Sequence, residues 1–295
     1  MKHAFLITVY KNPCQLLQLI DSLNSESSVF FIHVDRKSKS FMDDPCSAKL
    51  SGRDNVFFAK DRIDVKWGGF SHLQAIVALL KESRNYSNFD FYHSLTGQDF
   101  PIKPISYILD YFLKNGNSEF IEFRNLPTEK WPNGGIDRLE FMHFNDYFNP
   151  KKKMFKTLNS FLLKFQEKIN YKRTFILGFP QLYGGSTWWS LSGVCVNYIL
   201  NYLNNNKWYY NRFKFSHCAE EIFFQTIIAN SPLKDRVVND NLRYIDWVFR
   251  NGNSPANLDL SDFDNLMKSK KLFARKFEGK IGQELLDKLK KYTGF

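Results

Sequence analysis

Two adjacent acids, Glu220 and Glu221, stand at the start of an apolar segment, residues 222–228. A carboxylate in such a place can accept a proton from a hydroxyl group and so act as a general base. Acids are also common in the first turn of a helix, where they complement the helix dipole. The pattern alone leaves both interpretations open, and they are compatible, because a helix start fixes the position of its own side chains.

A second pair of charged residues, Arg275 and Lys276, lies between two phenylalanines, Phe273 and Phe277. Surface cations are common, but apolar anchors on both sides would hold these two rigidly over a pocket. Rigidly placed cations bind phosphate groups well. An acid that removes a proton, together with a cation that holds a leaving diphosphate, would make a sugar transferase.

A third segment, residues 184–192, reads GGSTWWSLS. Its two glycines allow the backbone to approach a ligand closely. Trp188 and Trp189 cannot both face the same core if the segment is extended, because successive side chains of a strand point to opposite sides. One ring is therefore a candidate for lining a sugar site, although packing in the core is the commoner role of either ring alone.

The elements that must hold these residues alternate between strand and helix in the first third of the chain. Apolar runs predict strands at residues 4–9, 29–34, 55–59, 89–95 and 120–123, and helical spacing predicts helices at 13–23 and 71–80, the latter capped near Ser71. The alternation predicts an α/β fold with a mostly parallel central sheet flanked by helices. Ligands bind beyond the carboxyl ends of such strands, where Asp35 and Asp99 fall.

The composition is that of a globular protein with an anionic partner. The chain has 295 residues, of which 43% are hydrophobic and 17% aromatic, so it can build a large core and is not globally disordered. Its formal net charge is +11, which indicates nucleic acid, a membrane surface or a phosphorylated ligand as a partner. The chain contains neither the glycine-rich dinucleotide motif nor the P-loop motif, so neither would hold a nucleotide.

The cysteines and the apolar segments bear on the location of the protein. Cys14, Cys46, Cys195 and Cys218 are widely separated and have no zinc-ligand spacing, so we expect reduced thiols in a cytosolic protein. We interpret residues 1–10 as a first strand and not as a signal peptide. No stretch reaches the roughly 20 apolar residues of a membrane-spanning helix.

One segment, residues 151–173, combines an apolar face with many lysines. The face consists of Phe155, Leu158, Leu162, Phe165 and Ile169. Two structures would produce this pattern. One is a surface helix that packs its apolar stripe on the core, and the other is a basic helix that lies on anionic lipid.

Seven segments occur together in an order that is similar to a known family. They are FFIHVDRKS (30–38), VKWGGFS (65–71), YHSLTGQDFPIK (92–103), GGSTWWSLS (184–192), CAEEIFFQTII (218–228), LRYIDW (242–247) and LFARKF (272–277). The chain resembles the core 2/I-branching β-1,6-N-acetylglucosaminyltransferase family, which also contains the peptide O-xylosyltransferases. The resemblance implies a GT-A fold and an inverting transfer from a UDP-sugar without a metal ion.

The resemblance also implies roles for the two charged pairs. Glu221 falls on the catalytic base of the family, although the usual Pro-Asp-Glu is Ala219-Glu220-Glu221 here. Lys276 falls on the lysine that binds the diphosphate. The arginine that accompanies this lysine in the family is replaced by Ala256, so Arg275 or Arg250 is the candidate substitute.

The remaining matches divide between donor and acceptor. Asp35 matches a position near the uridine, and Trp67 and Asp99 are assigned with it to the nucleotide-sugar site. The acceptor residues are Trp247, which matches an aromatic that stacks on the acceptor sugar, with Glu122 and Trp188. Metal-dependent relatives carry Asp-x-Asp at the strand end where this chain offers only Asp99, and Asp262 and Asp264 fall in an expected helix, so we expect no metal ligands.

These assignments predict one GT-A-like domain, residues 1–295, with a nucleotide-sugar-binding half at 1–105 and an acceptor-binding and catalytic half at 106–295. The donor is expected to be UDP-GlcNAc, with UDP-xylose as the alternative, and the acceptor a glycan or a lipid-linked glycan. The expected location is cytoplasmic, as in a bacterial-type member, with peripheral membrane contact through residues 151–173.

Two other classes of protein compete with the transferase. A glycoside hydrolase needs two carboxylates that flank one bond, which Glu221 and Glu122 would have to supply because Glu220 diverges from Glu221 on a helix. A nucleic-acid-binding protein would fit the charge, but the basic residues are scattered and no recognition motif is present, so we expect no nucleic-acid partner.

Overall fold

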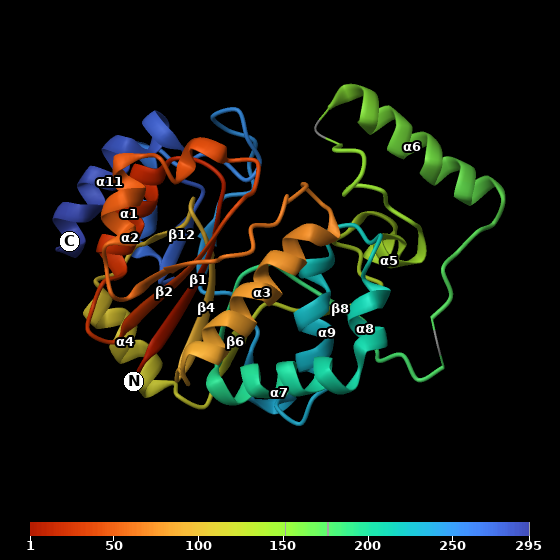
Figure 1. The fold of residues 1–295 in the computed structure, drawn as a ribbon, viewed down its shortest axis with the longest axis horizontal. Coiled ribbons are helices and arrows are strands. Elements are labelled where there is room, and N and C mark those ends of the chain that lie inside the picture. The colour runs from red at the N-terminus through yellow and green to blue at the C-terminus, as the bar shows by residue number, and fades with distance from the viewer. Residues whose placement is uncertain (151, 176, 295) are drawn as a thin grey trace.

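The computed structural model describes residues 1–150, 152–175 and 177–294. Its centre is a seven-stranded sheet with the strand order β10-β6-β9-β4-β1-β2-β3 (Figure 1). The strands are β1 (His3–Val9), β2 (Ser28–Val34), β3 (Val56–Phe58), β4 (Phe91–Thr96), β6 (Glu119–Ile121), β9 (Trp189–Ser192) and β10 (Val237–Val238). Strand β9 runs antiparallel to both of its neighbours, and the other pairs are parallel. The predicted α/β fold with a mostly parallel sheet is confirmed.

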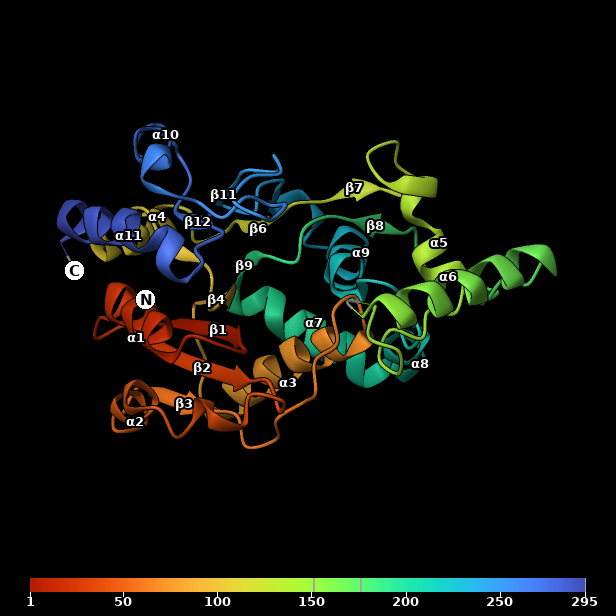
Figure 2. The same ribbon diagram turned by 90° about the horizontal axis from the view of Figure 1, so that it is seen from above.

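Helices cover both faces of this sheet, which explains why β1 and β2 are almost continuously apolar. One face packs against α1 (Pro13–Leu23), α2 (Pro45–Ser51), α4 (Ile105–Lys114) and α11 (Gly279–Thr293). The other face packs against α3 (Phe70–Tyr86), α7 (Gly193–Asn205), α8 (Lys207–Arg212) and α9 (Phe223–Ala229). The layers are visible edge-on in Figure 2. The architecture is that of a GT-A-like fold.

Two small sheets extend this core. Strands β11 (Arg243–Ile245), β12 (Phe273–Arg275) and β5 (Phe100–Pro101) form one of them, and β7 (Arg124–Asn125) pairs with β8 (Tyr183–Gly184) in the other. Because β5 follows β4 directly in the chain, the first small sheet brings the basic segment at the end of β12 beside the end of β4.

The predicted cap of α3 is wrong in its detail. The helix begins at Phe70, and the cap position is Gly69, which has no side chain to offer. The carboxylate of Asp146 instead accepts the backbone N–H groups of Phe70, at 2.8 Å, and Ser71, at 3.1 Å. A partner 75 or more residues away in sequence supplies the cap, so local sequence signals could not reveal it.

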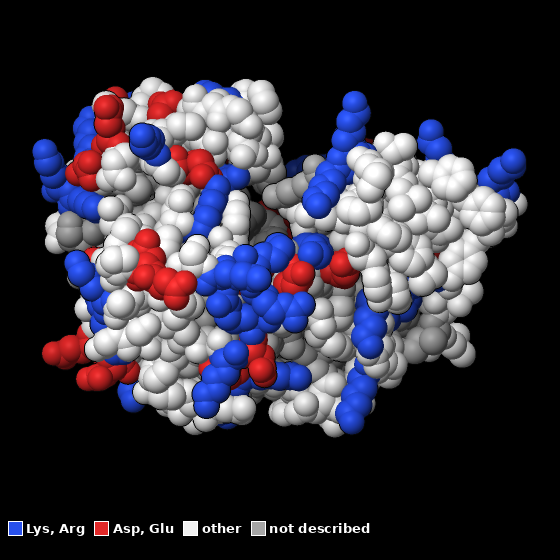
Figure 3. All heavy atoms as spheres, turned by 45° about the horizontal axis from the view of Figure 1, so that its top comes forward, with Lys and Arg blue, Asp and Glu red and all other residues white. Residues whose placement is uncertain are grey.

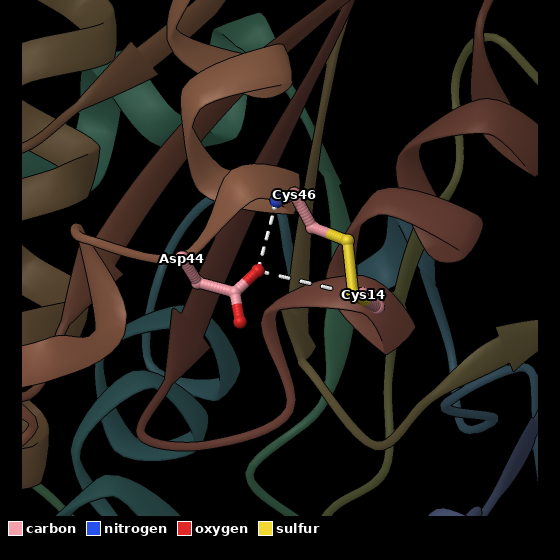
Figure 4. Close-up of side chains that lie close together, drawn as sticks. All are labelled: Cys14, Asp44 and Cys46. Atoms are coloured by element: carbon pink, nitrogen blue, oxygen red, sulfur yellow. Dashed lines mark hydrogen bonds between the residues drawn. A yellow bond between two sulfur atoms is a disulfide. The ribbon is translucent and has the colours of Figure 1, made fainter.

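The prediction that all four cysteines are reduced is also wrong. Cys14 and Cys46 form a disulfide that joins α1 to α2, while Cys195 and Cys218 are free (Figure 4). The two cysteines lie 32 residues apart, and only the packing of α1 on α2 brings them together. Asp44 lies beside them and caps α2, and these three residues are the one cluster of metal-type ligands found in the described ranges.

Helix α6 (Lys153–Lys168) stands apart from the sheet, next to the short helix α5 (Asp137–Glu140) (Figures 1 and 2). The predicted helix is present, although Lys151 lies outside the described residues. The predicted apolar face is only partly covered by the body of the protein. Phe155, Leu158 and Leu162 are half-buried against the body, whereas Met154, Phe161, Phe165 and Ile169 are exposed.

No helix among the described residues combines the length and the apolar character needed to cross a bilayer. The remaining helix, α10 (Phe263–Lys268), lies near the C-terminal helix α11 and contains Asp264. Asp262 ends the 3-10 turn just before it, so neither acid lies on a strand end.

Candidate active site

The sheet collects the predicted site residues at one edge. Strands β1, β2, β4, β6 and β10 run in the same direction and end there, and the antiparallel β9 begins there. Asp35 follows β2, Glu122 follows β6 and Trp188 precedes β9. Asp99 lies in the turn after β4. This is the edge at which parallel sheets bind ligands.

Asp99, Arg275 and Trp188 form one compact cluster at this edge. Asp99 is fully buried, and one of its oxygens accepts a hydrogen bond from Arg275 Nη1 at 3.1 Å. The guanidinium carbon of Arg275 lies 4.0 Å from the centre of the Trp188 ring, a cation–π contact. Burial lowers the pKa of Arg275, and the charge of Asp99 opposes this effect. Trp189, on the opposite side of the strand, is fully buried in the core.

Lys276 follows β12 and is partly exposed, between the fully buried rings of Phe273 and Phe277. The backbone N–H of Phe277 donates to the carbonyl of Gln98 at 3.0 Å. The amide of Gln15 bridges the carbonyls of Phe277 and Gly97. The expected apolar anchors are therefore present, and they fix the backbone of Lys276 against the turn after β4.

The two candidates for the missing phosphate-binding arginine are both engaged elsewhere. Ala256, which occupies the position of the family's arginine, is fully buried. Arg250 pairs with a group of acids that consists of Asp246, Asp259 and Asp262, with its shortest contact to Asp262 at 2.6 Å. Arg275 is held between Asp99 and Trp188. Asp262, the first acid of the Asp-x-Asp pattern at residues 262–264, therefore has a structural role, because it pairs with Arg250.

The acidic doublet lies on a 3-10 turn, Ala219–Glu221, and α9 begins only at Phe223. Glu220 turns inward, where it is buried and pairs with His72 Nδ1 at 3.0 Å. Glu221 turns outward, with 27% of its side chain exposed, and pairs with Arg138 Nη1 at 2.6 Å. The predicted helix start is thus a tight turn, and this turn sends the two carboxylates in different directions.

The two acids have pKa values shifted in opposite directions. Burial raises the pKa of Glu221 to about 7, against the opposing charge of Arg138 and with a further increase from Glu220. Burial acts on Glu220 in the same sense, but the charge and hydrogen bond of His72 outweigh it and lower the pKa of Glu220. Such a divergence between neighbouring carboxyl groups is typical of acid–base sites.

The backbone of residues 184–188 connects the acidic turn with the rest of the edge. Gly185 N–H donates to the carbonyl of Glu221 at 2.8 Å. Ser186 Oγ accepts from Asn241, which also donates to Glu122 Oε2 at 3.1 Å. A Cβ on Gly185 would lie 1.8 Å from the carbonyl oxygen of Glu122, so only glycine fits. The close approach expected of this glycine is to the protein's own backbone.

A pocket of about 490 Å³ opens beside this segment. Glu122 and Trp247, both predicted to bind the acceptor, line it, and the Trp247 side chain is 63% exposed. Glu122 forms an ion pair with Arg124. The pocket is also lined by Arg124, Asn241 and Lys271, which were not predicted, because no local motif in the sequence distinguishes them from other surface residues.

The other two predicted donor residues lie at the ends of the segment 35–67, which contains α2 and β3. Asp35 is buried, and its carboxylate accepts from Lys37 Nζ at 2.9 Å. Trp67 is 54% exposed, with its ring 5.6 Å from that of His217. The carbonyl of Gly68 accepts from Cys218 N–H at 3.0 Å, so Trp67 adjoins the acidic turn. On the face drawn in Figure 3, Lys and Arg side chains gather around a hollow.

A mostly parallel sheet of this topology, with carboxylates and cations gathered at its carboxyl edge, is consistent with the GT-A-like fold of a class of glycosyltransferases. The sequence model of the Core-2/I-Branching enzyme family matches residues 3–267. The chain belongs to this family. Membership favours a transferase over the hydrolase and nucleic-acid-binding alternatives.

Curated relatives extend the similarity over nearly the whole chain. Xylosyltransferase 2 of Rattus norvegicus is 25% identical over 304 residues, which are 96% of this chain and 33% of that protein. Xylosyltransferase 1 of Rattus norvegicus is 23% identical over 314 residues, 98% of this chain and 35% of that protein. Xylosyltransferase of Ciona intestinalis is 25% identical over 298 residues, 93% and 32% respectively. The chain spans about a third of the length of these relatives.

Proposed function

We propose that the chain transfers a sugar, with inversion, from a UDP-sugar to a hydroxyl of a glycan acceptor, and that Glu221 is the general base. The observation that carries this proposal is the environment of Glu221. Its carboxylate is partly exposed, has a pKa raised to about 7 by burial, and lies on a turn tied through Gly185 to the donor and acceptor residues. A general base works best when its pKa is near the operating pH.

In this mechanism the acceptor hydroxyl attacks the anomeric carbon of the donor from the face opposite UDP. Glu221 takes the hydroxyl proton as the new carbon–oxygen bond forms. The bond between the anomeric carbon and the β-phosphate oxygen breaks, and its electron pair stays on UDP. Lys276 stabilises this developing charge electrostatically, because its backbone is already fixed against the turn after β4.

The raised pKa of Glu221 predicts the pH dependence of the reaction. The folded value, about 7, is higher than the ordinary value, so below pH 7 the carboxyl is mostly protonated and cannot accept a proton. We expect kcat/KM to fall about tenfold per pH unit below this value and to level off above it. Initial rates of UDP release between acid and alkaline pH measure the profile, and a flat acid limb would contradict the assignment of the base.

The transfer is proposed to need no metal ion. The turn after β4 offers one acid, Asp99, and this acid is buried and paired with Arg275. We expect full activity in excess EDTA. Loss of activity that manganese restores would contradict this proposal, and calcium-saturated EDTA serves as the control for effects of the chelator itself.

The donor is proposed to be UDP-GlcNAc, with UDP-xylose as the alternative. The family contains enzymes for both, and relatives similar to this chain are named xylosyltransferases. A screen of UDP release with UDP-GlcNAc, UDP-xylose and UDP-glucuronate tests the function directly. Release of UDP that depends on added glycan supports a transferase. Absence of UDP binding together with hydrolysis of a glycoside would overturn it.

The acceptor is proposed to be a glycan that enters the pocket lined by Glu122 and Trp247. An exposed tryptophan suits the flat C–H face of a sugar, and a carboxylate can accept hydrogen bonds from its hydroxyls. A lipid-linked glycan is proposed as one form of this acceptor, since α6 could bring the enzyme to a membrane.

The proposed membrane contact is supported by the exposed side of α6. Met154, Phe161 and Phe165 are all at least half exposed, and Lys164 and Lys168 flank them. Apolar side chains beside lysines favour anionic lipid surfaces. In Figure 3 the lobe on the right, which contains α6, carries separated lysines between uncharged side chains. The proposed location is the cytoplasmic face of a membrane, although the Cys14–Cys46 disulfide is more typical of oxidising compartments.

We expect the protein to sediment with phosphatidylglycerol vesicles at low salt and not with phosphatidylcholine vesicles. The double substitution Phe161→Glu and Phe165→Glu should abolish sedimentation, because it places charge in the apolar contact. The control is Lys290→Gln with Lys291→Gln on α11, which lowers the net charge by the same two units. If both double variants sedimented with the phosphatidylglycerol vesicles to the same extent as the unmodified protein, contact through α6 would be contradicted.

A further inference from the structure

We propose that Arg138 is a positioning residue, which holds Glu221 Oε2 and leaves Oε1 to receive the proton of the acceptor hydroxyl. This inference rests on the proposed role of Glu221. Arg138 Nη1 lies 2.6 Å from Oε2. Within the described part of the chain, Oε1 has no hydrogen-bond partner. The carboxylate is therefore held through one oxygen, and the other oxygen is available to the acceptor.

The guanidinium of Arg138 is itself fixed in place. Its carbon lies 3.8 Å from the centre of the Trp131 ring, and only 16% of the side chain is exposed. A cation over an aromatic face and a charged hydrogen bond to a carboxylate reinforce each other. The backbone carbonyl of Arg138 accepts from His217 N–H at 3.0 Å, which ties the arginine to the segment that carries Glu221.

Two glycines make room for the ring on which the arginine rests. A Cβ on Gly135 would lie 2.4 Å from the Trp131 ring, and a Cβ on Gly184 would lie 2.6 Å from it. Gly135 also has φ +81°, a conformation that other residues rarely adopt. Gly184 belongs to the same segment as Gly185, which binds the carbonyl of Glu221. Two separate segments of the backbone, at Gly135 and Gly184, therefore leave the space in which Trp131, Arg138 and Glu221 stack.

The electrostatic surroundings give this contact a chemical consequence. The charged and titratable groups near Glu221 are Arg138, Glu220 and His72, with Cys218 directly before the turn. Burial and Glu220 raise the pKa of Glu221, and Arg138 is the strongest influence in the opposite direction. His72 is already hydrogen-bonded to Glu220. Without Arg138 the carboxyl would be mostly protonated at neutral pH and could not accept a proton.

The test compares Arg138→Gln and Arg138→Lys with Arg53→Gln, a matched control that removes another arginine–carboxylate contact of 2.6 Å, the Arg53–Asp21 pair. In Arg138→Gln the acid limb of the kcat/KM profile should move to higher pH by about one unit or more, because an opposite charge at this distance shifts a pKa by about that amount. Activity then falls by at least about tenfold at pH 6 and recovers at alkaline pH. In Arg138→Lys, which keeps the positive charge, the acid limb should move much less than in Arg138→Gln. In Arg53→Gln it should stay at the pH of the unmodified protein.

A carboxyl titration separates this inference from the proposed function. The 13C carboxyl resonance of Glu221, identified by its loss in Glu221→Gln, reports ionisation even if no donor is turned over. A midpoint that rises in Arg138→Gln supports the inference. An unchanged midpoint in folded Arg138→Gln, or a lower plateau of activity with an unmoved acid limb, would show that Arg138 is only structural.

Discussion

Glu221→Gln is expected to lower kcat by about 10²–10⁴-fold while UDP binds as tightly as before. The amide keeps the size of the side chain, and its oxygen can still accept the hydrogen bond from Arg138 Nη1. It cannot take a proton from the acceptor hydroxyl. Steady-state rates measure the loss of turnover, and isothermal titration calorimetry measures UDP affinity.

The adjacent acid gives a control for this substitution. Glu220→Gln changes the same chemical group one residue away, but Glu220 is buried and paired with His72, so its proposed role is structural. A second control is Glu284→Gln on the exposed side of α11. If Glu220→Gln abolished turnover and Glu221→Gln did not, the base would have been assigned to the wrong member of the doublet.

The sequence predicted the central fold well because buried parallel strands leave a strong apolar signal. Strands β1, β2 and β4 lie within two residues of their expected limits, and α1 has the expected limits with Pro13 at its first position. Features that depend on distant partners were missed. The cap of α3 comes from Asp146, and the Cys14–Cys46 disulfide depends on the packing of α1 on α2.

The candidate site shows the same division. Strand direction was enough to predict that Asp35 and Asp99 lie at one edge of the sheet, where Glu122 is also found. They were not enough to find Arg138, which lies 83 residues from Glu221 in the sequence and has no motif around it. The sequence also could not separate the environments of Glu220 and Glu221, because the 3-10 turn, and not residue spacing, directs their side chains.

The family's second diphosphate-binding residue, an arginine, is replaced by Ala256 in this chain, so the diphosphate must be stabilised in another way. Arg250 is neutralised by three acids, and Arg275 is buried against Asp99 and Trp188. Arg275 therefore supports the edge, in our interpretation, by holding Trp188 and Asp99 together. Under this interpretation the stabilisation of the diphosphate depends more on Lys276 than it would in a family member with both cations.

Lys276→Ala is therefore expected to lower kcat/KM by about 10²–10³-fold, equivalent to roughly 3–4 kcal/mol of transition-state stabilisation. Unlike Glu221→Gln, it should also weaken UDP binding, since the lysine would contact the diphosphate both before and after transfer. Lys276→Arg keeps the charge but not the point geometry of an ammonium group, so it should restore only part of the loss. Lys280→Ala, which removes an exposed lysine four residues further along, is the matched control.

Unchanged UDP affinity in Lys276→Ala would mean that another cation holds the diphosphate. The two variants together thus separate proton removal from leaving-group stabilisation, because only the lysine variant should lose both turnover and UDP.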